Sequence, residues 1–285
     1  MKFSFNTKIM RFHPLSEAVD LIAKAGFQAV ELMADRPHAF PRDLNAERIS
    51  ALNHCLAERK LQVSNLNSAT VVSLEEPHNP SWVDEDWQIR EQRLRYTLDC
   101  LRLAAAIGVP QVSTQGAGPI PSGSTYRESF RLFVAILHRV LPLARKLGVR
   151  LLIEPTPGML IENSDHLLDL MAELDFSDFL QVSFDNVHFH LAGENPLSAW
   201  ERLKDHVSLV RLSDTTDQSP HSHVVLGEGI LDLPAFLTAV QRSGFEGYVT
   251  IQPEGNEQRA DMVVLGAAAY LRGAGFMAGG GETPG

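Results

Sequence analysis

The sequence has few cysteines and no long run of apolar residues. Its 285 residues include only two cysteines, Cys55 and Cys100, which are too few for a disulfide framework and favour reduced thiols. No stretch approaches the roughly 20 apolar residues that a membrane-spanning helix needs. The first residues also lack the apolar run and the small-residue cleavage site of an export signal. We therefore expect a cytoplasmic protein with no membrane partner.

Basic residues are scarce relative to acidic ones. The chain has 25 lysines and arginines against 35 aspartates and glutamates, which gives a formal net charge of −10. An excess of negative charge repels phosphate backbones at long range, so nucleic acid is disfavoured as a partner. Hydrophobic residues make up 44% of the chain, which is enough for one large core or two smaller ones.

Short apolar runs alternate with longer amphipathic runs along nearly the whole chain. Glycine closes several amphipathic runs just before an apolar one, as in Ala25-Gly26-Phe27, and supplies the left-handed conformation that ends a helix. Eight strands in a chain of this length give roughly 36 residues per strand–helix unit, which is typical of a (β/α)8 barrel. The expected strands are Phe3–Thr7, Ala29–Met33, Gln62–Asn67, Gln111–Gln115, Arg150–Glu154, Gln181–Asp185, Leu209–Leu212 and Tyr248–Gln252.

A doubly wound open sheet is the alternative architecture. No Gly-x-Gly-x-x-Gly follows the first strand, which disfavours that fold and a nucleotide cofactor with it. We predict an α/β protein with one domain, a (β/α)8 TIM barrel over residues 1–275, followed by a flexible glycine-rich tail over residues 276–285. The long connections Ser73–Trp87 and Thr215–Leu231 are either substrate lids or variable surface loops.

Polar side chains stand at the carboxyl ends of most expected strands. Because these ends converge on one face of a barrel, Glu154, Asp185 and Arg211 are expected to lie close together. A carboxylate directly after an apolar strand is costly to bury unless it meets a cation or hydrogen-bond donors. The two carboxylates therefore require a shared positive partner.

Several of these strand ends and the runs around them form a recognisable set of motifs: Ala25–Leu32, Leu152–Pro155, Phe184–Gly193, Leu226–Asp232 and Gly244–Tyr248. Together they resemble the xylose isomerase-like TIM-barrel superfamily of sugar and sugar-phosphate isomerases and epimerases. This resemblance implies proton abstraction next to a carbonyl, a divalent metal ion (Mn, Mg or Zn), no nucleotide cofactor, and a polyol, keto-sugar or sugar acid as substrate. Barrels of this type often form homodimers, and the sequence leaves the oligomeric state open.

The resemblance also implies four metal ligands, Glu, Asp, His and Glu, at the ends of strands five to eight. Glu154 and Asp185 occupy the first two positions, whereas Arg211 and Gln252 stand where the histidine and the last glutamate are expected. His188 matches a residue that commonly contacts substrate near the metal. Glu154 and Asp185 are therefore the metal ligands here only if a metal is retained.

The two departures change the chemistry. Arg211 cannot ligate a metal, because a guanidinium stays protonated and has no free lone pair. Gln252 could offer a carbonyl oxygen to a cation, but it cannot take a proton from a substrate, so an epimerase that uses the usual two carboxylates is disfavoured. We hypothesise that Arg211 replaces the metal by pairing with Glu154 and Asp185. The alternative is an ion held by Glu154, Asp185 and His188.

The candidate site residues fall into two groups, catalytic and substrate-binding. A further pair, His221 and His223 in the long loop after strand seven, could face a metal or phosphate, although a polar loop is the simpler interpretation. The catalytic candidates are Glu154, His188, Arg211 and Gln252, and the substrate-binding candidates are Asn67, Gln115, His190 and Glu254.

Four functions are compatible with the fold to different degrees. The first hypothesis is a sugar or sugar-phosphate isomerase or epimerase with an altered metal site. A related dehydratase or lyase would begin with the same proton abstraction. A barrel that has lost catalysis and binds a metabolite is the third. An endonuclease of the same superfamily would need additional His and Glu ligands, and the net charge opposes DNA binding.

Overall fold

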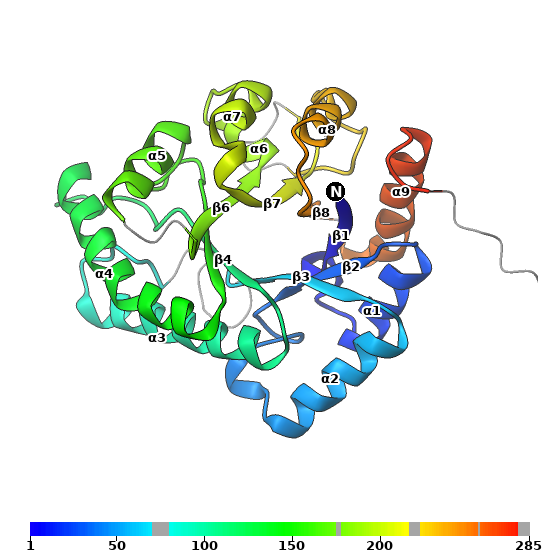
Figure 1. Ribbon diagram of the computed structural model, residues 1–285, viewed down its shortest axis with the longest axis horizontal. Coiled ribbons are helices and arrows are strands. Elements are labelled where there is room, and N and C mark those ends of the chain that lie inside the picture. The colour runs from blue at the N-terminus through cyan, green and yellow to red at the C-terminus, as the bar shows by residue number, and fades with distance from the viewer. Residues whose placement is uncertain (70–79, 175–177, 217–222, 256, 279–285) are drawn as a thin grey trace, which may run out of the picture.

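The computed structural model describes residues 1–69, 80–174, 178–216, 223–255 and 257–278. Eight parallel strands close into a barrel in sequence order, and helices surround it (Figure 1). The predicted (β/α)8 barrel is confirmed, and each predicted strand bound lies within two residues of the observed one. The strands are β1 (Lys2–Asn6), β2 (Ala29–Met33), β3 (Gln62–Asn67), β4 (Gln111–Gln115), β5 (Arg150–Glu154), β6 (Leu180–Asp185), β7 (Val207–Leu212) and β8 (Tyr248–Ile251).

The helices begin and end where local sequence signals place them. Before α4, Thr125 and Glu128 form a capping box in which each side chain accepts a hydrogen bond from the other's backbone N–H, and Gly148 ends the helix with a φ of 67°. The α-helices are α1 (Leu15–Lys24), α2 (Ala46–Glu58), α3 (Trp87–Ala106), α4 (Tyr126–Leu147), α5 (Ser164–Glu173), α6 (Asn186–Leu191), α7 (Pro196–Leu203), α8 (Leu233–Arg242) and α9 (Ala260–Gly273). Short 3-10 helices are η1 (Thr7–Met10), η2 (Pro41–Asp43), η3 (Lys204–His206) and η4 (Glu257–Arg259).

Some parts of the predicted organisation lie outside the described residues. Helix α9 ends at Gly273, and residues 279–285 of the predicted tail are not described, so the division at residue 275 stays a prediction. In the connection after β3, Trp82 is buried and its Nε1 donates to Thr114 Oγ1 at 3.1 Å, which ties this segment to β4. Among the described helices, none is both long and apolar enough to cross a membrane.

The barrel interior contains a connected set of polar side chains. Ser4 Oγ lies 2.7 Å from Ser64 Oγ, and Asn65 Nδ2 donates to Glu31 Oε1 at 2.9 Å and to Ser113 Oγ at 2.7 Å. All five residues are buried. Barrel interiors are usually filled by bulky branched side chains, so polar groups here need hydrogen-bond partners. The contacts above supply some of them, whereas Glu31 Oε2 and Asn65 Oδ1 have no partner among the described residues.

Asp214, just after β7, organises the loop that leads to α8. The Asp214 backbone pairs with that of Val224 in an antiparallel bridge. This bridge places His223, the residue before Val224, above the barrel. A Cβ added to Gly229 would lie 2.2 Å from Asp214 Oδ1, so glycine is required at that position. The Asp214 carboxylate accepts hydrogen bonds from the backbone N–H groups of Gly227, Gly229 and Leu231 at 3.0–3.1 Å.

Candidate active site

A cavity of about 440 Å³ opens over the carboxyl ends of the strands. Its size is within the range of sites for small ligands. Seven of the candidate catalytic and substrate-binding residues line it: Asn67, Gln115, Glu154, His188, Arg211, Gln252 and Glu254. The convergence expected from the strand ends is therefore present.

His190, a candidate substrate-binding residue, is not among the residues that line this cavity. It follows His188 by two positions on α6. A step of two residues turns a side chain by about 200° around a helix, so the two imidazoles point to opposite sides. His188 is the one that faces the cavity.

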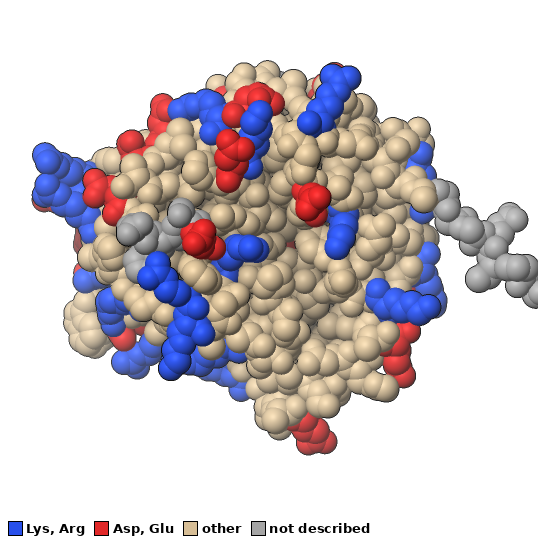
Figure 2. All heavy atoms as spheres, in the orientation of Figure 1, with Lys and Arg blue, Asp and Glu red and all other residues tan. Residues whose placement is uncertain are grey.

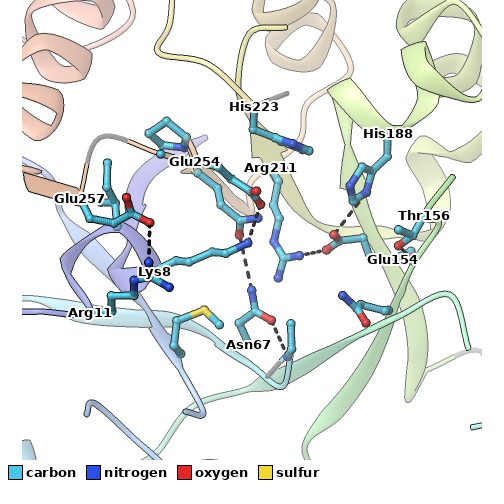
Figure 3. Close-up of a pocket in the computed structure, with 17 residues that line it drawn as sticks. Lys8, Arg11, Asn67, Glu154, Thr156, His188, Arg211, His223, Glu254 and Glu257 are labelled. Atoms are coloured by element: carbon cyan, nitrogen blue, oxygen red, sulfur yellow. Dashed lines mark hydrogen bonds and ion pairs between the residues drawn. The ribbon is translucent and has the colours of Figure 1, made fainter. Parts of the chain in front are cut away.

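Arg211 extends from β7 into the polar barrel interior, where it contacts two carboxylates. Its Nη2 donates to Glu31 Oε1 at 2.6 Å and to Ser113 Oγ at 2.7 Å, and its Nη1 contacts Glu154 Oε2 (Figure 3). The predicted contact with Glu154 is present, but the second carboxylate is Glu31 and not Asp185. Arg211 is only 3% exposed and Glu31 is fully buried, so these charges neutralise one another away from water.

Asp185 is the register partner of Arg211 on the neighbouring strand, but its side chain turns toward other partners. Its Oδ1 accepts the backbone N–H bonds of Val187 and His188, at 2.9 and 3.1 Å, and so caps α6. Its Oδ2 lies 3.3 Å from His223 Nε2. A carboxylate at a helix N-terminus is stabilised by the orphan N–H groups there, and this explains why Asp185 turns away from Arg211.

Two histidines stand next to this carboxylate in different electrostatic settings. Burial lowers the pKa of His188 to about 4, and neighbouring His223 adds to this effect. Burial also disfavours the charged form of His223, but the Asp185 carboxylate outweighs it and raises the pKa of His223. Burial acts to raise the pKa of Asp185, and the two imidazoles, with hydrogen bonds from His223 and the His188 backbone, lower it well below its usual value. The ring centroids of the two histidines are 5.0 Å apart in an edge-to-face arrangement.

His188 also contacts the carboxylate that pairs with Arg211. Its Nδ1 lies 3.4 Å from Glu154 Oε1, while Glu154 Oε2 accepts a hydrogen bond from Ser183 Oγ at 3.1 Å. Glu154 therefore touches Arg211 through one oxygen and faces His188 through the other. Its side chain is only 4% exposed.

The amide of Gln252 is held by two asparagines. Its Oε1 accepts hydrogen bonds from Asn6 Nδ2 at 2.9 Å and Asn67 Nδ2 at 3.4 Å. At the edge of the cavity, Lys8 Nζ lies 2.5 Å from Glu254 Oε1. Burial acts to raise the pKa of Glu254, but the Lys8 ammonium and then His223 more than offset this and lower it. The Gln252 carbonyl oxygen thus already has two donors.

Sequence reasoning did not select several residues of this site, and Glu31 and His223 are two of them. Glu31 lies in the middle of the apolar run Ala29–Met33, and its partner Arg211 is 180 positions away, so no local signal marks it. His223 belongs to a histidine pair that the simpler interpretation assigned to a polar loop, but it is 4% exposed and lines the cavity. Its companion His221 lies outside the described residues. Both basic and acidic side chains are exposed on the face of the molecule in Figure 2.

Residues 19–274 match the family model described as a xylose isomerase-like TIM barrel. The chain belongs to this family. Along the chain it is 25% identical over 153 residues to inosose dehydratase of Lacticaseibacillus casei, a match that covers 47% of this chain and about half (51%) of that enzyme. It is 23% identical over 248 residues to fructoselysine 3-epimerase of Escherichia coli O157:H7, which covers 84% of this chain and 85% of that enzyme.

The fold is also that of a solved structure, an IolI protein with a binding zinc atom. That structure superimposes with a TM-score of 0.79 at 17% identity, over 96% of this chain and 98% of the other. At this level of identity the likeness concerns the fold. That protein holds a zinc atom, so a barrel of this fold can carry a metal ion.

The four side chains at the family's metal position do not fit an ion. The Arg211 guanidinium takes the place of the expected histidine and already contacts Glu154, so an ion there would face a fixed positive charge. Gln252 presents a carbonyl oxygen that accepts from two amides, and Asp185 points to α6 and His223. As oriented, these four side chains do not form the four-ligand centre that the resemblance implies.

Proposed function

We propose that this protein is an enzyme that removes a proton from the carbon next to a carbonyl group of a small polyhydroxylated substrate, such as a keto-sugar, a polyol-derived ketone or a sugar acid. The observation that carries this proposal is the Arg211 guanidinium. It stands where the family has a metal ligand and pairs with the Glu154 carboxylate. A fixed cation at that place supplies the positive charge that an enolate requires.

The lining of the cavity supports a hydroxyl-rich ligand. Amide groups of Asn67, Gln115 and Gln252 and the hydroxyl of Thr156 face it, beside the charged residues. Such groups both donate and accept hydrogen bonds, which matches a substrate with several hydroxyls. The relatives named above act on an inosose and on fructoselysine, and these names are compatible with the same class.

Arg211 retains donors for a substrate oxygen. A guanidinium has five N–H groups, and three of them point to Glu31, Ser113 and Glu154. Its Nε is buried, so the second N–H of Nη1 is the donor that remains for a ligand. Since Arg211 lines the cavity, a substrate carbonyl oxygen placed there would accept from the guanidinium and be stabilised as negative charge develops on it.

Glu154 is the residue we assign as base. Its Oε1, the oxygen that does not contact Arg211, takes the proton from the carbon, and the C–H electron pair moves into the enolate, whose oxygen faces the guanidinium. His188, 3.4 Å from the same carboxylate, is placed to hydrogen-bond a neighbouring hydroxyl of the substrate. A positioned base of this kind contributes about 10²–10⁴-fold in rate.

Dehydration is the second candidate reaction, and one observation favours it over epimerisation. Epimerisation requires a proton donor on the opposite face of the carbon. Gln252 occupies the position where the resemblance implies a glutamate on that side, and its amide cannot act as an acid or base at neutral pH. Elimination of water needs one base and a proton for the hydroxyl that leaves the adjacent carbon. Glu154, once protonated, can return its proton to that hydroxyl, which then leaves as water while the C–O electron pair departs with it. A one-base isomerisation is compatible with the same residues.

The experiment is proton exchange in D₂O, followed by NMR with a panel of ketoses, inososes and keto-acids. We expect deuterium at the carbon next to the carbonyl, with loss of water marking a dehydratase. E154Q should slow exchange by at least about 100-fold, while H190A, a matched change outside the cavity, should leave it intact. Ligand binding without exchange for any substrate would show a metabolite-binding barrel and overturn the assignment.

A further inference from the structure

Two ion pairs connect η1 with the segment after β8 at the edge of the cavity. Lys8 Nζ contacts Glu254 Oε1 at 2.5 Å, and Arg11 Nη2 lies 3.3 Å from Glu257 Oε1. All four residues line the cavity, and the proton abstraction proposed above uses none of them. We propose that Lys8 and Arg11 form a subsite for an anionic group of the substrate, a carboxylate or a phosphate, at the end away from the carbonyl. The identity of that other end rests on the proposed function.

The geometry of η1 brings the two cations to one side. The Asn6 side chain at the end of β1 accepts the backbone N–H of Lys8 at 2.7 Å, so η1 starts directly where the strand ends. A 3-10 helix has about three residues per turn, and side chains at positions i and i+3 therefore lie one above the other. Lys8 and Arg11 have this spacing, with Arg11 as the residue that caps η1. Both side chains extend to the cavity from the same turn (Figure 3).

The two cations have more hydrogen-bond donors than their glutamates use. An ammonium carries three N–H groups and a guanidinium five. Among the described residues, Lys8 and Arg11 each pair with one carboxylate oxygen. The Arg11–Glu257 distance of 3.3 Å is also longer than the about 2.7–2.9 Å of a charge-assisted hydrogen bond. Donors on both residues are therefore available to the oxygens of a ligand.

The glutamates can give up these contacts when an anionic ligand arrives. The side chains of Glu254 and Glu257 are 35% and 28% exposed, so each carboxylate stays hydrated when it turns toward water. Ion pairs with this degree of exposure are weak. Arg211, by contrast, is 3% exposed and is held by two buried carboxylates. Lys8 and Arg11 are thus the cavity cations that can exchange their partners.

The subsite lies across the cavity from the reacting groups. Glu154 ends β5, whereas Lys8 follows β1, and these two strands stand opposite one another in the closed eight-stranded barrel. The cavity of about 440 Å³ is lined by residues of both sides. A substrate whose carbonyl faces Arg211 therefore places its far end beside η1. An anionic group at that end would receive hydrogen bonds from Lys8 and Arg11, and the substrate is then a keto-acid or a phosphorylated keto-sugar.

The experiment measures binding of carbonyl-free probes to the full-length protein by calorimetry. Glucitol is neutral, gluconate carries a carboxylate, glucitol 6-phosphate carries a phosphate, and glucamine carries an ammonium group. At low salt we expect gluconate or glucitol 6-phosphate to bind at least about tenfold more tightly than glucitol, because hydrogen bonds between charged groups are the stronger ones. The tighter of the two anions distinguishes a carboxylate from a phosphate subsite. High salt should reduce the difference from glucitol.

Four variants test which residues are responsible. K8M and R11M should each weaken binding of the preferred anion by at least about tenfold and change glucitol binding by less than about threefold. E257Q should strengthen anion binding, because it removes the carboxylate that competes for Arg11. K24M, which changes an exposed lysine of α1 that does not line the cavity, is the matched control and should bind every probe like the unchanged protein. Circular dichroism of each variant separates loss of the subsite from loss of the fold.

The comparison of probes on the unchanged protein needs no variant and can already overturn the proposal. It does so if neither anion binds more tightly than glucitol, or if glucamine binds more tightly than both anions, which would make this edge a cation site on the two glutamates. Anion binding that survives both K8M and R11M would place the anion elsewhere and refute the assignment as well. None of the probes can undergo proton exchange, so tight anion binding without exchange on any ketose would overturn the proposed function alone.

Discussion

Replacing Arg211 with methionine is expected to destabilise the fold more than an ordinary surface change. The guanidinium is 3% exposed and lies between Glu31 and Glu154, so R211M leaves two buried carboxylates without their cation. Removing one partner of a buried ion pair costs about 3–5 kcal/mol. A single contact of opposite charges about 4 Å apart contributes about 4 kcal/mol of attraction at an effective dielectric constant of about 20. Both scales give a loss of about 4 kcal/mol in the free energy of unfolding.

A double-mutant cycle isolates the cause of that loss. E31Q removes one of the two stranded charges, so E31Q/R211M should recover about 2 kcal/mol relative to R211M in urea unfolding followed by circular dichroism with chelator present. Arg93 is the matched control, because it is equally buried but its hydrogen bonds go to Ser68 and Thr114. Adding E31Q to R93M should recover nothing. An R211M loss below about 1 kcal/mol, or additive losses in the E31Q/R211M pair, would refute the reasoning.

Three further outcomes follow from buried groups outside the cavity. Burial lowers the pKa of His38. The stability that neutral His38 contributes is therefore fully present above its ordinary pKa of 6.5 and is lost as the pH falls through the lowered pKa. H38Q should flatten the fall of the urea midpoint below about pH 6.5. Burial raises the pKa of Cys100 to about 12, so iodoacetamide should label the partly exposed Cys55 in the native protein and Cys100 only after unfolding, as peptide mass spectrometry would detect. D214N weakens three backbone hydrogen bonds to a charge and should lower the urea-derived free energy of unfolding by about 3 kcal/mol.

Each of these outcomes has a result that would contradict it. The His38 prediction fails if H38Q and the unchanged protein lose stability in parallel as the pH falls. Equal labelling of both cysteines in the native state would show that Cys100 is reachable without unfolding. A D214N loss below about 1 kcal/mol would mean that the backbone N–H groups find other acceptors.

The barrel and the position of its cavity could be predicted from the sequence because both depend on local, repeated signals. Glycine after a helix and an apolar strand that ends in a polar residue recur along the chain, and parallel strands bring all such ends to one face. This rule predicts that Glu154, Asp185 and Arg211 lie close together, and the family resemblance adds His188. Each of these residues stands where a strand ends or one turn beyond it.

The partners of these residues could not be predicted, because they depend on side-chain direction across the barrel. The convergence of strand ends predicts that Arg211 pairs with Glu154 and Asp185, and only the pair with Glu154 is present. The orphan N–H groups at the start of α6 compete for that carboxylate and hold it, and Arg211 instead reaches across to β2. The sequence around Glu31, in the middle of a strand, does not distinguish it from any other buried strand position.

Histidine positions show the limits of spacing arguments more directly. His188 and His190 both follow β6, and only the turn of α6 decides which one faces the cavity. His223 is separated from β7 by a long loop, so its distance along the sequence says nothing about its distance in space. The Asp214 hydrogen bonds that bring the loop back over the barrel have no counterpart in the periodicity of the sequence.

The attachment of that loop has a consequence for how the protein can diversify. Asp214 fixes the loop at its start, and the Val224 bridge with the three backbone N–H groups fixes its end. Because the bridge and the N–H groups belong to the backbone, this attachment does not use the His223 side chain, which lines the cavity. A new substrate preference can therefore arise by substitution of His223, without any change to the strands that carry the chemistry.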